Sequence, residues 1–81
     1  MKNYAKVRVI ATDIEKNAKD PTKEYLKVLV CQGTEAVTFN LPTVTDFDTL
    51  TGMVGEEVWF ELKYNPTYKS MMFSAICDSP Q

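Results

Sequence analysis

Apolar and polar residues alternate with a period of two along most of this chain. In the first such segment, Val7 and Val9 alternate with Lys6 and Arg8. A period of two is typical of a β-strand that has one buried face and one face in water. Five segments follow this pattern, and they predict strands at residues 6–14, 24–31, 35–41, 57–63 and 69–77.

A different spacing follows the third of these segments, directly after a proline. Phe47, Leu50 and Val54 lie at positions i, i+3 and i+7, which is helical spacing. Thr45 precedes Asp48 by three positions, which is a capping-box pattern. We therefore predict a short helix between the third and fourth strands. This order of elements is typical of a five-stranded OB-type barrel, so we predict an all-β fold of that type.

The length of the chain favours one domain with a small core. With 81 residues, 44% hydrophobic and 25% charged, we predict a single globular OB-type domain over residues 1–81. Alternation on the last strand places Met71, Phe73, Ala75 and Cys77 on one face and Met72, Ser74 and Ile76 on the other. Because both faces are largely apolar, this strand is expected either to close the barrel or to contact a second copy. The expected homodimer interface uses the fourth and fifth strands and consists of Met71, Met72 and Phe73.

The sequence offers no sign of a membrane, a secretion signal or a redox motif. Its apolar runs are far shorter than the roughly 20 residues of a membrane-spanning helix, and the N-terminus lacks a long apolar region. We therefore expect a cytoplasmic protein without a membrane partner. Cys31 and Cys77 are far apart in strand-like segments, which favours two buried thiols over a disulfide or a metal site.

Enzymatic chemistry is not expected from this composition. The chain contains no histidine that could activate a serine or cysteine nucleophile, and it contains no Gly-rich phosphate loop. Asp46 and Glu57 have the spacing of the first and last ligands of a calcium loop, but Leu50 replaces a ligand and the required glycine is displaced. We therefore expect no catalytic residue, no metal and no cofactor.

Charge is distributed unevenly along the chain. Residues 1–30 carry seven Lys or Arg against four Asp or Glu, whereas residues 31–62 carry six acidic residues and no basic one. The net charge of −2 therefore combines a basic part with an acidic part. The acidic set consists of Glu35, Asp46, Asp48, Glu56, Glu57 and Glu61.

Three segments of the sequence resemble parts of a known class of protein. The first is Lys23 to Cys31, a basic loop followed by a strand that carries Tyr25. The second is the glycine before the strand that ends at Tyr64, and the third is the aromatic-flanked turn followed by Ser70 to Phe73. In these respects the chain resembles the small single-stranded DNA-binding proteins of filamentous phages, the gene-five type, and related proteins of mobile elements. The resemblance implies an OB-fold and a role in DNA replication.

The residues needed for single-strand binding are present. Proteins that hold single strands without reading sequence combine cations for phosphates with aromatic rings for bases. Lys6 and Arg8 on the first strand are expected to share a wet face with Tyr25 and Lys27 on the second. The resemblance implies that Tyr25 stacks on a base, that the hairpin lysines contact phosphates, and that Tyr68 reaches over from a neighbouring subunit. The full candidate set is Lys6, Arg8, Lys16, Lys19, Lys23, Tyr25, Lys27, Tyr64, Tyr68 and Lys69.

We therefore expect non-enzymatic, largely sequence-independent binding of single-stranded DNA, with RNA as the other candidate nucleic acid. Two alternatives remain open. The acidic set could imitate phosphates and bind a basic protein surface, as an inhibitor or adaptor does. The chain could also be a dimeric accessory module that binds no nucleic acid. In either case the lysines and arginine would only solubilise a sheet face, and Tyr25 would pack across strands against their methylene stems.

Overall fold

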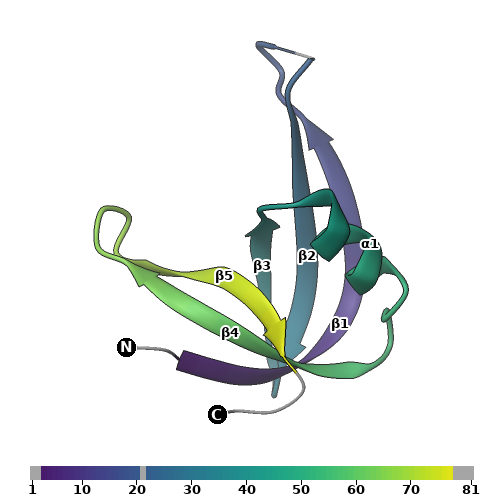
Figure 1. The fold of residues 1–81 in the computed structure, drawn as a ribbon, viewed down its shortest axis with the longest axis vertical. Coiled ribbons are helices and arrows are strands. Elements are labelled where there is room, and N and C mark those ends of the chain that lie inside the picture. The colour runs from purple at the N-terminus through teal and green to yellow at the C-terminus, as the bar shows by residue number, and fades with distance from the viewer. Residues whose placement is uncertain (1–2, 21, 78–81) are drawn as a thin grey trace.

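The computed structural model describes residues 3–20 and 22–77 and consists of one antiparallel sheet and one helix (Figure 1). The strand order in the sheet is β3-β2-β1-β4-β5, so β3 and β5 are the two outer strands. The sequence prediction of five strands and one helix between the third and fourth is confirmed. The elements are β1 (Asn3–Lys16), β2 (Glu24–Gln32), β3 (Glu35–Leu41), α1 (Val44–Thr51), β4 (Glu57–Asn65) and β5 (Ser70–Cys77).

The first strand is longer than its sequence pattern predicts, because it serves two neighbours. Residues 3–8 of β1 pair with β4, and residues 8–16 pair with β2. A β-bulge lies between Val9 and Ala11, where the pairing register with β2 shifts. A bulge bends its strand and increases the local twist. The strand therefore bends between its two partners, which curls the sheet (Figure 1).

The curled sheet does not close into a barrel. No hydrogen-bonded ladder joins β3 to β5 among the residues that the structure describes, although the two strands face each other. The predicted barrel is therefore confirmed only as far as five antiparallel strands and a short helix. Closure depends on the distance between two outer strands, and the alternation of side chains carries no information about that distance.

The core fills the concave side of the sheet and is centred on Phe60. The Phe60 ring meets Phe39 edge to face with ring centroids 5.9 Å apart, and meets Phe73 in the same way at 4.9 Å. Leu50 of α1 is fully buried in the same cluster, so the helix covers one end of the concave face. The remaining buried hydrophobic side chains come from β1 to β4 and are Ala5, Val7, Val9, Val28, Val30, Leu41 and Val58.

A second bulge changes which residues of β5 face the core. The pairing register shifts between Glu61 and Leu62, so Leu62 lies opposite Phe73 while Phe60 lies opposite Ile76. Ile76 therefore packs against the core together with Phe73. Simple alternation had assigned these two side chains to opposite faces, which is wrong because it assumes a strand without an extra residue.

The start of the helix differs from the sequence prediction. Thr43, not Thr45, is the N-cap: its Oγ1 accepts a hydrogen bond from the Asp46 amide at 3.1 Å and donates one to Asp46 Oδ2 at 2.9 Å. The helix ends at Thr51, so Val54 lies beyond it and is 48% exposed. Met53 packs against the core instead.

The Thr43 cap leads to a stability prediction. Thr43→Ala removes both hydrogen bonds at the helix start and should lower the free energy of unfolding by about 1 kcal/mol. For a domain of this size, that corresponds to a fall in Tm of roughly 4–8 °C, measurable by circular dichroism. Thr45→Ala is the matched control, because the Thr45 side chain forms no hydrogen bond with a described residue. An equal loss in both variants would contradict the assignment of the cap.

Other sequence expectations concern the thiols, membranes and metals. Cys31 and Cys77 are free thiols. Both are half-buried, whereas the sequence predicted that they would be buried. Within residues 3–20 and 22–77, no helix has the length and apolarity needed to cross a bilayer. The same residues contain no group of three or more His, Cys, Asp or Glu side chains placed to hold a metal ion.

Candidate nucleic-acid interface

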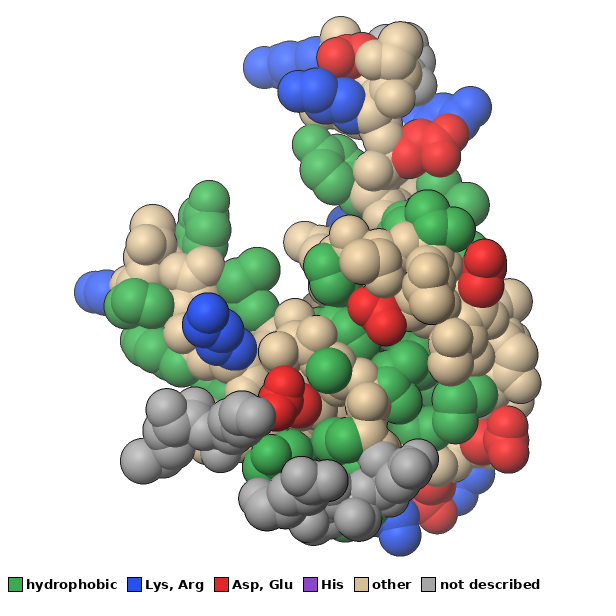
Figure 2. Space-filling model, viewed as in Figure 1, with side chains coloured by type: hydrophobic (Ala, Val, Ile, Leu, Met, Phe, Trp, Pro, Cys, Tyr) green, Lys and Arg blue, Asp and Glu red, His purple; other side chains and the backbone are tan. Residues whose placement is uncertain are grey.

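Two hairpins extend away from the core, and the free edge of β3 lies between them (Figure 1). The first is the β1–β2 hairpin, which continues beyond α1 as a two-stranded arm from the pair Asp13 and Lys27 to the pair Lys16 and Glu24. Figure 2 shows basic side chains gathered at the end of this arm. The exposed lysines at this end are Lys16, Lys19 and Lys23.

Asn17 holds the tip of this arm in a defined shape. Its backbone amide donates to the Lys23 carbonyl at 3.0 Å, and its side-chain oxygen accepts from the Lys19 amide at 2.9 Å. Its side-chain amide also donates to the Tyr25 hydroxyl at 3.2 Å. These bonds fix the backbone of the loop near its lysines and anchor the hydroxyl end of Tyr25, whose ring remains exposed.

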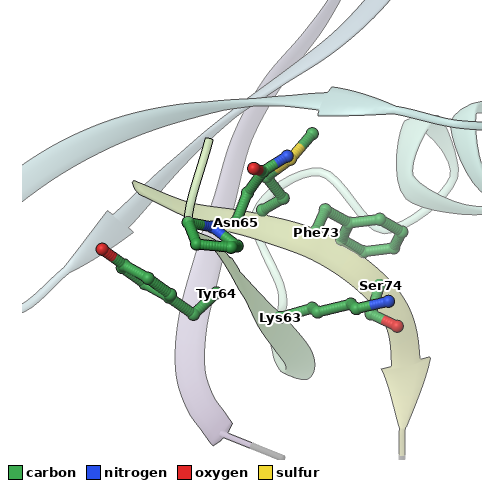
Figure 3. A pocket seen from close by; sticks show the side chains of 7 residues that line it. Lys63, Tyr64, Asn65, Phe73 and Ser74 are labelled. Atoms are coloured by element: carbon green, nitrogen blue, oxygen red, sulfur yellow. The ribbon is translucent and has the colours of Figure 1, made fainter. Parts of the chain in front are cut away.

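The second hairpin, between β4 and β5, presents aromatic rings. The Asn65 side-chain oxygen accepts hydrogen bonds from the amides of Thr67 at 2.9 Å and Tyr68 at 3.3 Å, which closes the turn. Tyr68 is 74% exposed at this turn. Tyr64 is also exposed. Tyr64 and Phe73 both line a hollow of about 380 Å³, and the Tyr64 ring points away from Phe73 (Figure 3). The neighbouring Lys69 has a positive φ of 51°.

A groove of about 870 Å³ lies between the outer strands β3 and β5. Figure 2 shows the hollow that separates the β4–β5 hairpin from the rest of the molecule. No charged side chain lines the groove among the described residues. The lining consists of Gln32, Val37, Thr38, Phe39, Asn40, Leu62, Tyr68, Ser70, Met71, Met72 and Phe73.

The basic residues on the outer face of the sheet lie within ion-pair distance of carboxylates, and Lys6 and Arg8 share one of them. Glu57 lies 3.3 Å from the Arg8 guanidinium and 3.9 Å from Lys6 Nζ, and Lys27 Nζ lies 2.7 Å from the Glu15 carboxylate. Arg8 also donates a hydrogen bond to the Gly55 carbonyl at 2.8 Å. These cations do share one face, as predicted, but each already has a carboxylate partner.

The strand register also separates these residues along the face. Arg8 lies opposite Cys31, whereas Lys27 lies opposite Asp13 and Tyr25 lies opposite Glu15, farther toward the arm. The structure therefore brings Tyr25 close to the hairpin lysines instead of close to Arg8. The four residues expected to lie together therefore form two groups at different places on the sheet. Lys6 and Arg8 form one group, and Tyr25 and Lys27 form the other.

Five lysines lie at the tip of the β1–β2 arm or on the β4–β5 hairpin and differ from the cations of the outer face. Among residues 3–20 and 22–77, none of these five forms an ion pair. These unpaired cations are Lys16, Lys19, Lys23, Lys63 and Lys69.

The acidic set does not form one cluster. Asp46 accepts a hydrogen bond from Thr43 on the helix, Glu57 holds the two cations of β1, and Glu61 accepts a hydrogen bond from Ser74 at 3.1 Å. Glu35 lies at the start of β3, which is an outer strand of the sheet. Several members are therefore engaged within the chain, and the set is divided among different elements.

The residues expected at a dimer interface are also separated. Phe73 is buried in the core, so it offers little surface to a second copy. Met71 is half-buried and Met72 is exposed, and both line the groove. Sequence reasoning did not single out Thr38 or Asn40, which appear in the sequence only as the polar positions of an alternating strand.

Chemically, the two hairpins provide unpaired ammonium groups and exposed aromatic rings, of which Tyr68 also lines the uncharged groove. Ammonium groups attract phosphates, and aromatic rings stack on bases. The arrangement therefore has the components of a surface for a flexible polyanion that carries planar groups. Comparisons with known protein families, curated proteins and solved structures give no match for this chain.

Proposed function

We propose that the protein binds single-stranded DNA, largely independently of sequence, between its two hairpins. One observation carries this proposal: the cations on the sheet face have carboxylate partners, whereas the lysines at the tip of the β1–β2 arm and on the β4–β5 hairpin have none among the described residues. Unpaired lysines can exchange counterions for phosphates without first losing an internal partner. Phosphate contacts are therefore assigned to the hairpins.

The aromatic residues supply the second part of the proposed mechanism. Tyr68 and Tyr25 are exposed on opposite hairpins, and each can stack on an unpaired base. One stacked base contributes about 1–3 kcal/mol, and stacking tolerates any base because every base has a π-face. The lysines would then hold the backbone while the tyrosines retain the bases, without reading the sequence.

The strand order supports an OB-type assignment, which we also propose. In OB-folds the loops between strands 1 and 2 and between strands 4 and 5 flank the ligand-binding face. The two projecting hairpins of this chain are the corresponding connections.

We further propose a homodimer, supported by the exposure of Tyr64 and Met72 on the β4–β5 hairpin. Association would cover these side chains. It would also stabilise the projecting hairpin, because a two-stranded hairpin without further packing is only marginally stable in water.

The proposal is tested by titrating the protein with fluorescent oligo-dT at several salt concentrations. We expect binding that weakens steeply as salt increases and that is stronger than binding to duplex DNA of the same length. Absence of binding at low salt would overturn the proposal. Equal binding to duplex DNA would show that the aromatic residues do not act on unpaired bases.

Removing the carboxylate that lies beside Lys6 and Arg8 is expected to strengthen binding to DNA. Glu57→Gln releases both cations, and the Arg8 guanidinium remains held by Gly55. We expect the affinity for oligo-dT to increase about 2- to 5-fold and the slope of log K against log salt to steepen, because one or two further phosphates can be neutralised.

Glu35→Gln is the matched control, because it removes the same charge from a residue that forms no ion pair within the described part of the chain. We expect it to change affinity by less than about 2-fold, since Glu35 holds no described cation that its neutralisation would release for a phosphate. If both variants increase affinity equally, the effect comes from net charge and the role assigned to the Glu57 ion pairs is wrong.

A further inference from the structure

One side chain, that of Asn65, connects the turn that carries Tyr68 to the neighbouring strand. Its Oδ1 atom accepts hydrogen bonds from the backbone amides of Thr67 at 2.9 Å and Tyr68 at 3.3 Å. Because both partners are donors, the orientation of the side-chain amide is determined: Oδ1 faces the turn and Nδ2 faces away from it. Nδ2 donates to the sulfur atom of Met72 on β5 at 3.1 Å (Figure 3).

The backbone of this turn requires such support. Lys69, directly after Tyr68, has a positive φ of 51°, which residues other than glycine rarely adopt. A residue in that conformation persists only where its surroundings impose it. Asn65 fixes the two amides that come directly before Lys69. Its hydrogen bonds therefore hold the turn in a shape that is unfavourable for the lysine itself.

The shape of the turn determines where the Tyr68 ring lies. Tyr68 lines the groove between β3 and β5, although it is 74% exposed. Since most of the ring surface has no protein contact, its place at the groove depends on the backbone to which it is attached. A ring that is already in place binds a ligand without the entropy loss of ordering the turn.

We propose that Asn65 is a positioning residue for Tyr68 and that the Met72 sulfur atom holds Asn65 in the orientation this role requires. This inference rests on the proposed function, because it takes Tyr68 as a residue that stacks on unpaired bases. It adds the contacts that prepare the ring before the single strand arrives. Asn65 itself need not touch the ligand.

The test is a double-mutant cycle of Asn65→Ala and Tyr68→Ala, titrated with oligo-dT. Tyr68→Ala should weaken binding about 5-fold or more, the contribution of one stacked base. Asn65→Ala should weaken it about 2- to 10-fold, the effect of having to order one side chain on binding. In the Tyr68→Ala background, Asn65→Ala should change affinity by less than about 1.5-fold, because the residue through which it acts is absent. Damage to folding or to association between copies would persist in that background.

Three single variants separate the two contacts of Asn65. Asn65→Ser keeps an oxygen that can accept the amide two residues later but lacks the amide group that contacts Met72, so it should restore part of the affinity lost in Asn65→Ala. Met72→Leu removes the sulfur acceptor at similar volume and should weaken binding about 2- to 3-fold. Met71→Leu is the matched control, because the Met71 sulfur forms no hydrogen bond with a described residue and Met71 also lines the groove. It should bind like the wild-type protein.

Hydrogen exchange measured by NMR tests the positioning without any ligand. The amides of Thr67 and Tyr68 should exchange about 5-fold faster or more in Asn65→Ala, the factor that one neutral hydrogen bond contributes. Asn65→Ser should accelerate them less, and Met71→Leu should leave them unchanged.

Several outcomes would overturn the inference while leaving single-strand binding in place. They are an equal Asn65→Ala loss in both backgrounds, an unchanged affinity in Tyr68→Ala, and unchanged exchange of the two amides in Asn65→Ala. If the wild-type protein does not bind oligo-dT at low salt, the proposed function fails first and the inference fails with it.

Discussion

Neutralising Lys19 and Lys23 together should weaken binding to oligo-dT by about 10- to 30-fold at 0.1 M salt. Each phosphate contact with a single strand contributes about 0.7 to the slope of log K against log salt, so the loss of two contacts should flatten the slope by about 1.4. Both lysines are exposed at the tip of the β1–β2 arm and have no ion-pair partner among the described residues. The measurement is the Lys19→Gln/Lys23→Gln double variant titrated with oligo-dT at four or more salt concentrations.

The matched control for this variant is Lys6→Gln/Lys27→Gln. It removes the same charge from two lysines that already have carboxylate partners, Glu57 and Glu15. We expect less than about a 3-fold loss of affinity and little change in slope, since these ammonium groups have to leave a carboxylate before they contact a phosphate. Equal losses in the two double variants would show that total charge, and not the hairpin tip, governs binding.

The largest expected effect on stability comes from Phe60→Ala. Phe60 is fully buried and its ring contacts Phe39 and Phe73, so its removal leaves a cavity between strands β3, β4 and β5. Truncation of a buried Phe costs about 3–5 kcal/mol. A domain of this length is stabilised by about 4–12 kcal/mol in total, so most of the stability should be lost. Urea denaturation followed by circular dichroism measures the change.

Two further variants complete this test. Val54→Ala shortens an apolar side chain that is nearly half exposed beyond the helix, and it should change the free energy of unfolding by less than about 0.5 kcal/mol. The leucine of Phe60→Leu fills most of the cavity, so the loss of free energy of unfolding should lie between those of Phe60→Ala and Val54→Ala. This variant keeps the series measurable if the alanine variant does not fold. A Phe60→Ala loss below 1 kcal/mol would contradict the central position of this ring.

The alternation of side chains was sufficient to locate every strand. Buried positions such as Val7, Val28 and Val58 follow directly from the period of two. The sequence did not locate the bulges between Val9 and Ala11 and between Glu61 and Leu62, because an extra residue in a strand depends on how the partner strand fits. The position of Ile76 in the core was missed for that reason.

The candidate site was predictable in part. The three lysines of the first loop and the two tyrosines of the second turn stand out in the sequence as exposed hairpin residues. The ion pairs of Lys6 and Arg8 with Glu57 did not, because they join residues about fifty positions apart through the pairing of β1 with β4. The groove gave no signal, since β3 becomes an outer strand only in the assembled sheet.

The sequence by itself determined the number, order and approximate limits of the elements, because side-chain periodicity, Pro and Gly act locally. It also determined the basic and aromatic character of the two loops. Tertiary structure alone decided which cations keep a carboxylate partner, where the sheet remains open, and which side chains line the groove. Each of these depends on distances between strands remote in sequence, and such distances follow from register, bulges and curvature, which no local pattern specifies.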